Sequence, residues 1–391
     1  MNYFEGRDYF KDGANHSECS KGYAAIGKSV LLLIAFAIIA ACTQKKEVAE
    51  PAVPEIPQFE IRYGTNIAHW LSQSDRRGEA RARFFTRRDI EQIVSLRFDH
   101  IRLPVDEEQL WDAAGNRNDS AFALLDSCLT WCRKDFVRVV LDLHILRSHH
   151  FNADEKPLWT KVEEQDKFIR MWRDLSSFVR KWPNQLLAYE FMNEPVADKA
   201  SDWNRLLLRV ADSIRSWEPE RTLVIGSNRW QSADTFDSLE VPIDDKNIIL
   251  SFHFYEPFYL THYKASWTKL KDFKGNVNYP GQIVPDGKLP EERRIYNIDT
   301  LEKMMSKPFA LAAKLNLPLY CGEFGVIDGA PEEAKLRWYA DMVSIFKKHS
   351  VAFANWNFKS GSFGIVDESG QPDTALISIL PGKQYYILES Q

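Results

Sequence analysis

Short apolar segments alternate with amphipathic segments from residue 59 onward. Eight of these segments are predicted strands, and most of them run almost without a polar break, which is typical of parallel strands covered on both faces. They span residues 60–68, 100–105, 136–144, 186–194, 222–228, 247–255, 317–325 and 351–359. Between them, hydrophobic residues recur at helical spacing. The clearest predicted helices are residues 86–98, 120–135, 162–182, 201–217 and 331–350, with Thr86 and Ser201 as N-caps.

Eight β/α alternations in about 330 residues predict a single (β/α)8 TIM barrel. The alternative is a doubly wound open sheet, but no glycine-rich phosphate loop follows the first predicted strand. A TIM barrel carries its functional groups at the carboxyl ends of its strands. Polar or aromatic residues do stand at or near each predicted strand end. They are Asn66, Arg102, His144, Asn193, Glu194, Asn228, His253, Tyr255, Glu323, Trp356 and Asn357.

Two of these strand ends carry a glutamate after an apolar run. Glu194 lies in "AYEFMNEP" and Glu323 lies in "LPLYCGEFGV". An unpaired buried carboxylate costs several kcal/mol, so packing explains Glu194 at the end of its apolar run poorly. Cleavage of a glycosidic bond uses two carboxylates, of which one is a general acid. A separation of about 5–5.5 Å gives retention and about 6.5–9.5 Å gives inversion, and the sequence leaves both outcomes open.

Six neighbouring residues suit the same chemistry. They are Arg102, His144, Asn193, His253, Tyr255 and Trp356. The arginine and the tyrosine can stabilise an ionised carboxylate, the asparagine can donate to a sugar hydroxyl, and the histidines can position hydroxyls or tune the acid. The tryptophan can stack on a sugar ring. Taken singly, the arginine is equally explained as a structural ion-pair partner, the first histidine as a core residue and the tryptophan as barrel packing.

Six short motifs resemble glycoside hydrolase family 5, the cellulase-like retaining β-glycanases. The motifs are "IRLPV", "LDLH", "MNEP", "HFYEP", "CGEFG" and "NWNFK", and the similar region runs from residue 64 to 367. The resemblance implies a retaining mechanism with Glu194 as acid/base and Glu323 as nucleophile, without a metal or other cofactor. It assigns the six neighbours to the family's other active-site positions. It leaves open whether the substrate is cellulose, another β-glucan, xyloglucan, mannan or a glycolipid.

Two further segments bear on the substrate groove. Residues 256–291 contain Phe258, Tyr259, Tyr263, Trp267 and Tyr279. These aromatics either form one wall of the groove or pack on one another in a surface excursion. The stretch "GTNIAHWLSQS" places His69 or Trp70 near the sugar.

The composition of the 391-residue chain narrows the classes of partner. It is 45% hydrophobic and 27% charged, as in globular proteins, and its net charge of −5 gives no basic surface for nucleic acid. The family resemblance implies a polysaccharide or oligosaccharide substrate, and we expect a monomer. Cys128 and Cys132 are expected to be core thiols, and Cys321 to point to the same side of its strand as Glu323.

The N-terminal residues resemble a bacterial lipoprotein leader. Residues 29–44 are uncharged, their apolar core is shorter than a membrane span, and it ends in Ile39-Ala40-Ala41-Cys42. This predicts a leader over residues 1–42 with lipid attached to Cys42, a proline-containing tether over 43–57 and a catalytic domain over 58–391. The protein would then be held on the cell envelope, at an outer membrane, facing the periplasm or the exterior. An uncleaved anchor is the alternative.

Two other functions remain open at this stage. A metal-dependent barrel hydrolase would use the clustered His144, His149 and His150, although they lack the usual spacing of a ligand set. A lipid-anchored glycan-binding protein would keep the aromatics on a catalytically weak barrel. The presence of both glutamates favours the enzyme.

Overall fold

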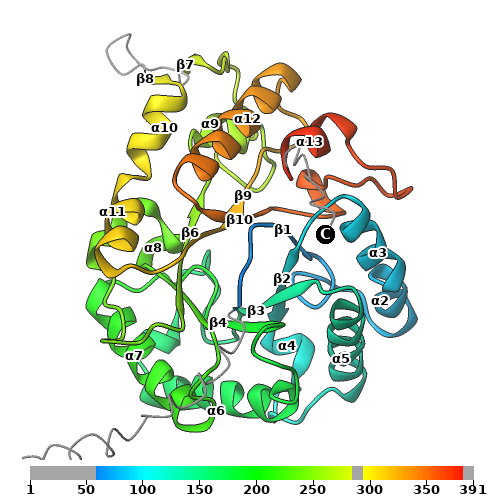
Figure 1. Cartoon of the computed structure of the whole chain (residues 1–391), viewed down its shortest axis with the longest axis vertical. Coiled ribbons are helices and arrows are strands. Elements are labelled where there is room, and N and C mark those ends of the chain that lie inside the picture. The colour runs from blue at the N-terminus through cyan, green and yellow to red at the C-terminus, as the bar shows by residue number, and fades with distance from the viewer. Residues whose placement is uncertain (1–58, 284–293, 382–391) are drawn as a thin grey trace, which may run out of the picture. The chain divides into compact units, whose positions relative to one another are not determined.

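Eight parallel strands close into a barrel in the computed structural model, which describes residues 59–283 and 294–381 (Figure 1). Their order around the barrel is β1-β10-β9-β6-β5-β4-β3-β2. The strands are β1 (Tyr63–Asn66), β2 (His100–Asp106), β3 (Arg138–Ile145), β4 (Leu187–Glu190), β5 (Leu223–Gly226), β6 (Ile248–Phe254), β9 (Leu319–Phe324) and β10 (Ala352–Asn355). Each strand overlaps one of the eight predicted segments, so the predicted TIM barrel is confirmed. The predicted leader and tether lie outside the described residues.

Helices surround the barrel (Figure 1). They are α2 (Gly78–Phe84), α3 (Arg87–Ser95), α4 (Glu107–Leu110), α5 (Asp119–Lys134), α6 (Val162–Val179), α7 (Ala200–Trp217), α8 (Asn228–Gln231), α9 (Phe258–Thr261), α10 (Ile298–Met304), α11 (Ser306–Leu315), α12 (Glu332–Lys348) and α13 (Thr374–Ile379). Short 3-10 turns are η1 (Pro157–Trp159), η2 (Ala233–Ser238) and η4 (Gly361–Phe363). None of the helices in the described ranges is long and apolar enough to cross a membrane.

The two predicted N-caps have different outcomes. Thr86 precedes α3 as expected. Its main-chain N–H and its hydroxyl donate hydrogen bonds to the carboxylate of Asp89, at 2.7 and 2.9 Å. The prediction for Ser201 is wrong, because α7 begins at Ala200 and its N-cap is Lys199. The acidic and polar residues at 201 and 202 fall inside the first turn instead.

The barrel interior changes from apolar to polar along the strands. A cluster of seven buried side chains fills its lower part: Phe59, Val140, Ala188, Val224, Ile249, Tyr320 and Ala354. Because side chains of a strand alternate between its two faces, the next inward positions lie two residues further on. These positions hold Asp142 on β3, Glu190 on β4 and Ser251 on β6, all of them buried. Asp142 and Glu190 therefore lie above a mainly apolar layer, toward the carboxyl ends of their strands.

A β-bulge between β6 and β9 sets the direction of Glu323. Phe252 pairs with Cys321, but the next residue of β6, His253, pairs with Glu323, so Gly322 is an extra residue on β9. Cys321 belongs to the core between barrel and helices, whereas Glu323 faces the barrel mouth. The prediction that they share one side of the strand is therefore wrong. Cys128 and Cys132 are free, buried thiols in the core, as expected.

The long connection after β6 was expected either to form a wall of the groove or to fold on its own aromatic residues, and it does both. It includes β7 (Gly281–Ile283), which pairs with β8 (Arg294–Tyr296) in an antiparallel sheet. Tyr259 and Tyr263 pack against Phe273, with ring centroids 5.1 and 6.2 Å away. The buried Tyr279 donates a hydrogen bond to Asp341 of α12 at 2.6 Å. This part of the connection is thus folded on its own aromatic residues and fastened to the helical layer.

Candidate active site

A cleft with a volume of about 1180 Å³ opens at the carboxyl ends of the strands. Seven of the eight predicted site residues line it: His144, Asn193, Glu194, His253, Tyr255, Glu323 and Trp356. The eighth, Arg102, lies beneath the cleft and is fully buried. It is the third residue of β2, so it lies within its strand rather than at the tip. Its long side chain carries the charge upward to the other groups.

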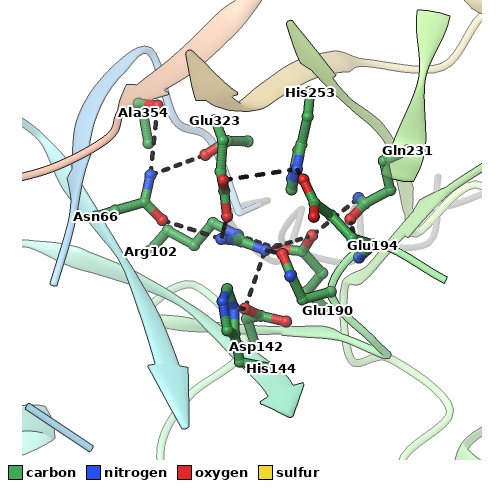
Figure 2. A network of polar contacts seen from close by, with 12 residues as sticks. Asn66, Arg102, Asp142, His144, Glu190, Glu194, Gln231, His253, Glu323 and Ala354 are labelled. Atoms are coloured by element: carbon green, nitrogen blue, oxygen red, sulfur yellow. Dashed lines mark hydrogen bonds and ion pairs between the residues drawn. The ribbon is translucent and has the colours of Figure 1, made fainter. Parts of the chain in front are cut away.

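Arg102 connects the polar residues of the site (Figure 2). Its guanidinium nitrogens contact Asn66, Asp142, Glu190, Asn193 and Glu323 at 2.6–3.1 Å. Burial alone would lower the pKa of Arg102, but the charges of the three carboxylates raise it well above its ordinary value. The arginine is therefore permanently charged and compensates a cluster that would otherwise be strongly negative.

Glu323 has a separate hydrogen-bond donor for each carboxylate oxygen. Arg102 Nη1 donates to Oε1 at 2.6 Å, and the Tyr255 hydroxyl donates to Oε2 at 3.0 Å. Burial raises the pKa of Glu323, while Arg102 opposes this shift by charge and Tyr255 by its hydrogen bond. Both donors stabilise the ionised carboxylate, which is the form that a nucleophile requires.

Glu194 has a different environment. It follows β4 with a left-handed main chain (φ 46°), and its Oε1 lies 3.0 Å from Nδ1 of His253. Burial, followed by the negative charge of Glu323, raises the pKa of Glu194 well above its ordinary value. The charge of Arg102 opposes this shift, but among the described residues no hydrogen bond or ion pair joins Glu194 to an arginine. These surroundings favour the protonated form of Glu194, whereas those of Glu323 include two donors that favour its ionised form.

The two glutamates and His253 form a compact group. One carboxylate oxygen from each glutamate and a ring nitrogen of His253 all lie within 4.8 Å of one another. Among the described residues this is the group whose donor atoms could hold a metal ion. However, the fixed charge of Arg102 at Glu323 disfavours a second cation there. The same space suits a reacting sugar carbon between an acid and a nucleophile.

His144 packs at the edge of the cleft with both ring nitrogens in contact. Its Nδ1 lies 2.6 Å from Asp142, its Nε2 lies 2.9 Å from the amide of Gln73, and its ring stacks on Trp356 at 5.7 Å. Burial lowers the pKa of His144 to about 4, so the ring is neutral near neutral pH. Burial raises the pKa of Asp142 to about 7, although Arg102 opposes the shift.

The predicted histidine cluster does not form a metal site with His144. His149 is buried, and its Nε2 accepts the N–H of Val196 at 3.1 Å. His150 stacks on Phe151 instead. Two other predicted strand-end residues serve the structure rather than the cleft. Asn228 makes a pair of hydrogen bonds with the main chain of Ala197, at 2.8 and 2.9 Å, and Asn357 is buried away from the cleft lining.

Sequence reasoning missed three buried residues that surround the predicted pair: Asp142, Glu190 and Gln231. Glu190 lies in the same stretch as Glu194, and its two carboxylate oxygens accept hydrogen bonds from Arg102 at 2.6 and 3.1 Å. The sequence could have indicated Glu190. It lies two positions after Ala188, which faces the barrel interior, and side chains two positions apart on a strand face the same side. No sequence pattern indicates Gln231. Its side chain enters the site from the turn after β5.

Exposed aromatic residues extend the cleft. Phe258, His262 and Trp267 of the connection after β6 line it, and the first two stack at 4.1 Å. Trp267 is 57% exposed, and Trp230 on the turn after β5 is 43% exposed. The connection therefore also supplies a wall of the groove. His69 lines the cleft, whereas Trp70 is fully buried.

A (β/α)8 barrel whose cleft holds two carboxylates in unlike surroundings has the architecture of a glycosidase. The family model of cellulases (glycosyl hydrolase family 5) matches residues 69–362. The chain belongs to glycosyl hydrolase family 5. It is therefore an O-glycosyl hydrolase, as the sequence motifs predicted.

Curated relatives and solved structures agree with this assignment. Endoglucanase C of Acetivibrio thermocellus is 32% identical over 339 residues, which cover 82% of this chain and 98% of the relative. Cellodextrinase A of Ruminococcus flavefaciens is 30% identical, covering 74% of this chain and 83% of the relative. The fold is similar to that of Thermotoga maritima Cel5A in complex with mannotriose, with a TM-score of 0.67, 24% identity and coverage of 81% and 96%.

Proposed function

We propose that the protein is a retaining glycosidase of β-glucans, with Glu194 as acid/base and Glu323 as nucleophile. The observation that carries this proposal is the closeness of the two carboxylates, whose nearest oxygens lie within 4.8 Å. Inverting enzymes keep about 6.5–9.5 Å between their carboxyl groups to accommodate a water molecule, whereas retaining enzymes keep about 5–5.5 Å. The short distance between the two carboxylates supports the retaining arrangement.

In the first step, a carboxylate oxygen of Glu323 attacks the anomeric carbon, and the bond to the glycosidic oxygen breaks. Glu194 gives its proton to that oxygen, which leaves as an alcohol, and the sugar remains bound to Glu323 as an ester. In the second step, Glu194 takes a proton from a water molecule, whose oxygen attacks the same carbon and releases Glu323. Two inversions at one carbon retain its configuration.

The neighbouring residues support this assignment of roles. Arg102 and Tyr255 favour the ionised form of Glu323, and burial next to a negative charge favours the protonated form of Glu194. The amide oxygen of Asn193 accepts from Arg102 at 2.9 Å. This orientation turns its NH2 group away from the arginine, as donation to a sugar hydroxyl requires.

The proposed substrate class rests on the relatives, which are named endoglucanases and a cellodextrinase. The purified protein should be tested against cellulose, mixed-linkage glucan, xyloglucan and mannan, with the anomers of fresh products followed by NMR. Initial release of the β-anomer from a β-linked substrate supports retention, and initial release of the α-anomer contradicts it. Glu194→Gln and Glu323→Ala should each lower turnover by at least about 10³-fold with an unchanged circular dichroism spectrum.

We also propose that lipid on Cys42 holds the enzyme at the cell envelope. The support is the short uncharged segment that ends in two alanines and a cysteine, followed by a polar segment with three prolines. Mass spectrometry of the mature N-terminus tests this proposal. A chain that still begins at Met1 and stays with the membrane would favour an uncleaved anchor, and Cys42→Ser should release the predicted lipoprotein from membranes.

A further inference from the structure

Gln231 connects the main chain of Glu194 with the side chain of Glu190. Its Oε1 accepts the N–H of Glu194 at 2.9 Å, and its Nε2 donates to Oε1 of Glu190 at 3.1 Å. The side chain is fully buried. One neighbour is a donor and the other an acceptor, so only a side chain with both functions at its tip satisfies them together. An amide is such a group, and neither a carboxylate nor an alkyl group is.

The turn that presents Gln231 has an unusual main chain. Arg229, Trp230 and Gln231 all have left-handed conformations, with φ of 59°, 60° and 51°. Residues with a Cβ rarely adopt this conformation, and three in succession persist only when the surroundings hold them. The N–H of Trp230 donates to the carbonyl of Pro195 at 3.3 Å. The turn is thus fastened to the segment that carries Glu194 by both main chain and side chain.

The barrel leaves space for this amide. Gly226 is the last residue of β5, and a Cβ built there would lie 2.6 Å from Cγ and Nε2 of Gln231. It would also lie 2.7 Å from the main-chain oxygen of Ser251. Any other residue at position 226 would therefore displace the Gln231 side chain. Gln231 Nε2 also approaches the Ser251 hydroxyl at 3.4 Å, so the amide is closely packed between β5 and β6.

Glu194 itself needs such support, because its own φ of 46° is left-handed. Gln231 accepts its main-chain N–H and is linked onward through Glu190 to Arg102, which also holds Glu323 (Figure 2). We propose that Gln231 is a positioning residue that fixes the main chain of Glu194 so that its carboxyl group reaches the glycosidic oxygen. This inference rests on the proposed role of Glu194 as acid/base.

A comparison of leaving groups tests the inference. The two probes are a β-glucan oligosaccharide that the wild-type protein cleaves and the 2,4-dinitrophenyl glycoside of the same glycosyl portion. A sugar alcohol leaves only with a proton from the acid, whereas dinitrophenolate leaves without one. Gln231→Leu should lower kcat/KM about 30- to 100-fold for the oligosaccharide and less than about three-fold for the dinitrophenyl glycoside. Both values report the first chemical step.

Gln231→Glu provides a second readout with nearly the same shape. One carboxyl oxygen still accepts the N–H of Glu194, but the other faces Glu190 and fits only when it carries a proton. The activity of this variant on the oligosaccharide, relative to wild type at each pH, should therefore rise as the pH falls. The dinitrophenyl glycoside should show little of this pH-dependent change. A purely structural role for Gln231 predicts the same change with both probes, and that result would overturn the inference.

Two control variants separate the outcomes. Asn204 of α7 is another buried amide that bridges two main-chain groups, at 2.7 and 3.3 Å, but it does not line the cleft. Asn204→Leu should lower stability without changing the ratio between the two probes. Glu194→Gln should impair the oligosaccharide selectively; if it impairs both probes equally, the proposed role of Glu194 is wrong. If Gln231→Leu impairs both probes equally while Glu194→Gln is selective, only the positioning role of Gln231 is wrong. If Gln231→Leu does not fold, the pH dependence of the activity of Gln231→Glu relative to wild type decides.

Discussion

The Tyr255 hydroxyl donates to Oε2 of Glu323, while Arg102 donates to the other oxygen of the same carboxylate. The two donors differ in what their loss would do. Arg102 holds several carboxylates, so its removal would leave buried charges without compensation. Tyr255 is neutral, and its removal changes one hydrogen bond. Tyr255 is therefore the position at which the acidity of Glu323 can be altered with the fold intact.

Tyr255→Phe should raise the pKa of Glu323, because the hydrogen bond from Tyr255 lowers it. The nucleophile must be ionised, so activity is lost as the pH falls through this pKa. The acidic limb of the kcat/KM profile should therefore move to higher pH, and kcat/KM at the optimum should fall about 10- to 100-fold. The profile should be measured on a soluble β-glucan. An acidic limb that stays in place would contradict the role of Tyr255.

Glu190→Gln should affect the basic limb instead. The negative charge of Glu190 contributes to the raised pKa of Glu194, so its removal lowers that pKa. The acid must be protonated, and activity is lost as the pH rises through its pKa. The basic limb should therefore move to lower pH. Breaking the buried pair with Arg102 should also lower the free energy of unfolding by about 3–5 kcal/mol, measured in denaturant.

Glu218→Gln is the matched control for Glu190→Gln. Glu218 is also buried against an arginine, with Oε2 at 2.7 Å from Nη2 of Arg221, but it does not line the cleft. The control should lose stability while both limbs of the pH profile keep their positions. An equal shift of the basic limb in both variants would mean that general destabilisation, rather than local charge, sets the profile.

Trp267→Ala should weaken the binding of long substrates. Trp267 is 57% exposed on the wall of the cleft, where its ring can cover the apolar face of a sugar. Loss of one stacking contact of about 1 kcal/mol should raise KM for longer oligosaccharides roughly five-fold and leave kcat nearly unchanged. Phe136→Ala is the control, since Phe136 is 85% exposed just before β3 and does not line the cleft. Equal KM values for wild type and Trp267→Ala at every chain length would exclude this contact.

Chelation should leave activity unchanged. Glu194, His253 and Glu323 have donor atoms close enough for a metal ion, but Arg102 already supplies a positive charge 2.6 Å from Glu323 Oε1. Protein dialysed against EDTA should therefore retain its full rate, checked beside metal analysis of the same sample. Loss of activity on chelation with recovery on adding one divalent metal would favour the metal-dependent alternative.

The sequence was sufficient for the barrel because its signals are local. Apolar runs, helical spacing and the residues at strand ends each occupy a few consecutive positions, and parallel strands bring their ends to one edge. Glu194 and Glu323 were found in this way. Asp142, Glu190 and Gln231 were not, because the contacts that make them part of the site join segments that are separated along the chain. The N-cap prediction at Ser201 was wrong because the residue at which a helix begins is set by local geometry, which the sequence pattern locates only to within one or two residues.

The bulge at Gly322 has a consequence for engineering this enzyme. Regular pairing of β9 with β6 would match Gly322 with His253, and the alternation of side chains would then direct Glu323 toward the helices. The direction of Glu323 therefore depends on the bulge, and a variant that restores regular pairing without removing a residue should fold with this carboxylate directed away from the cleft. Deletion of Gly322 would instead leave Glu323 opposite His253, and loops beyond Phe324 are the safer place to vary length.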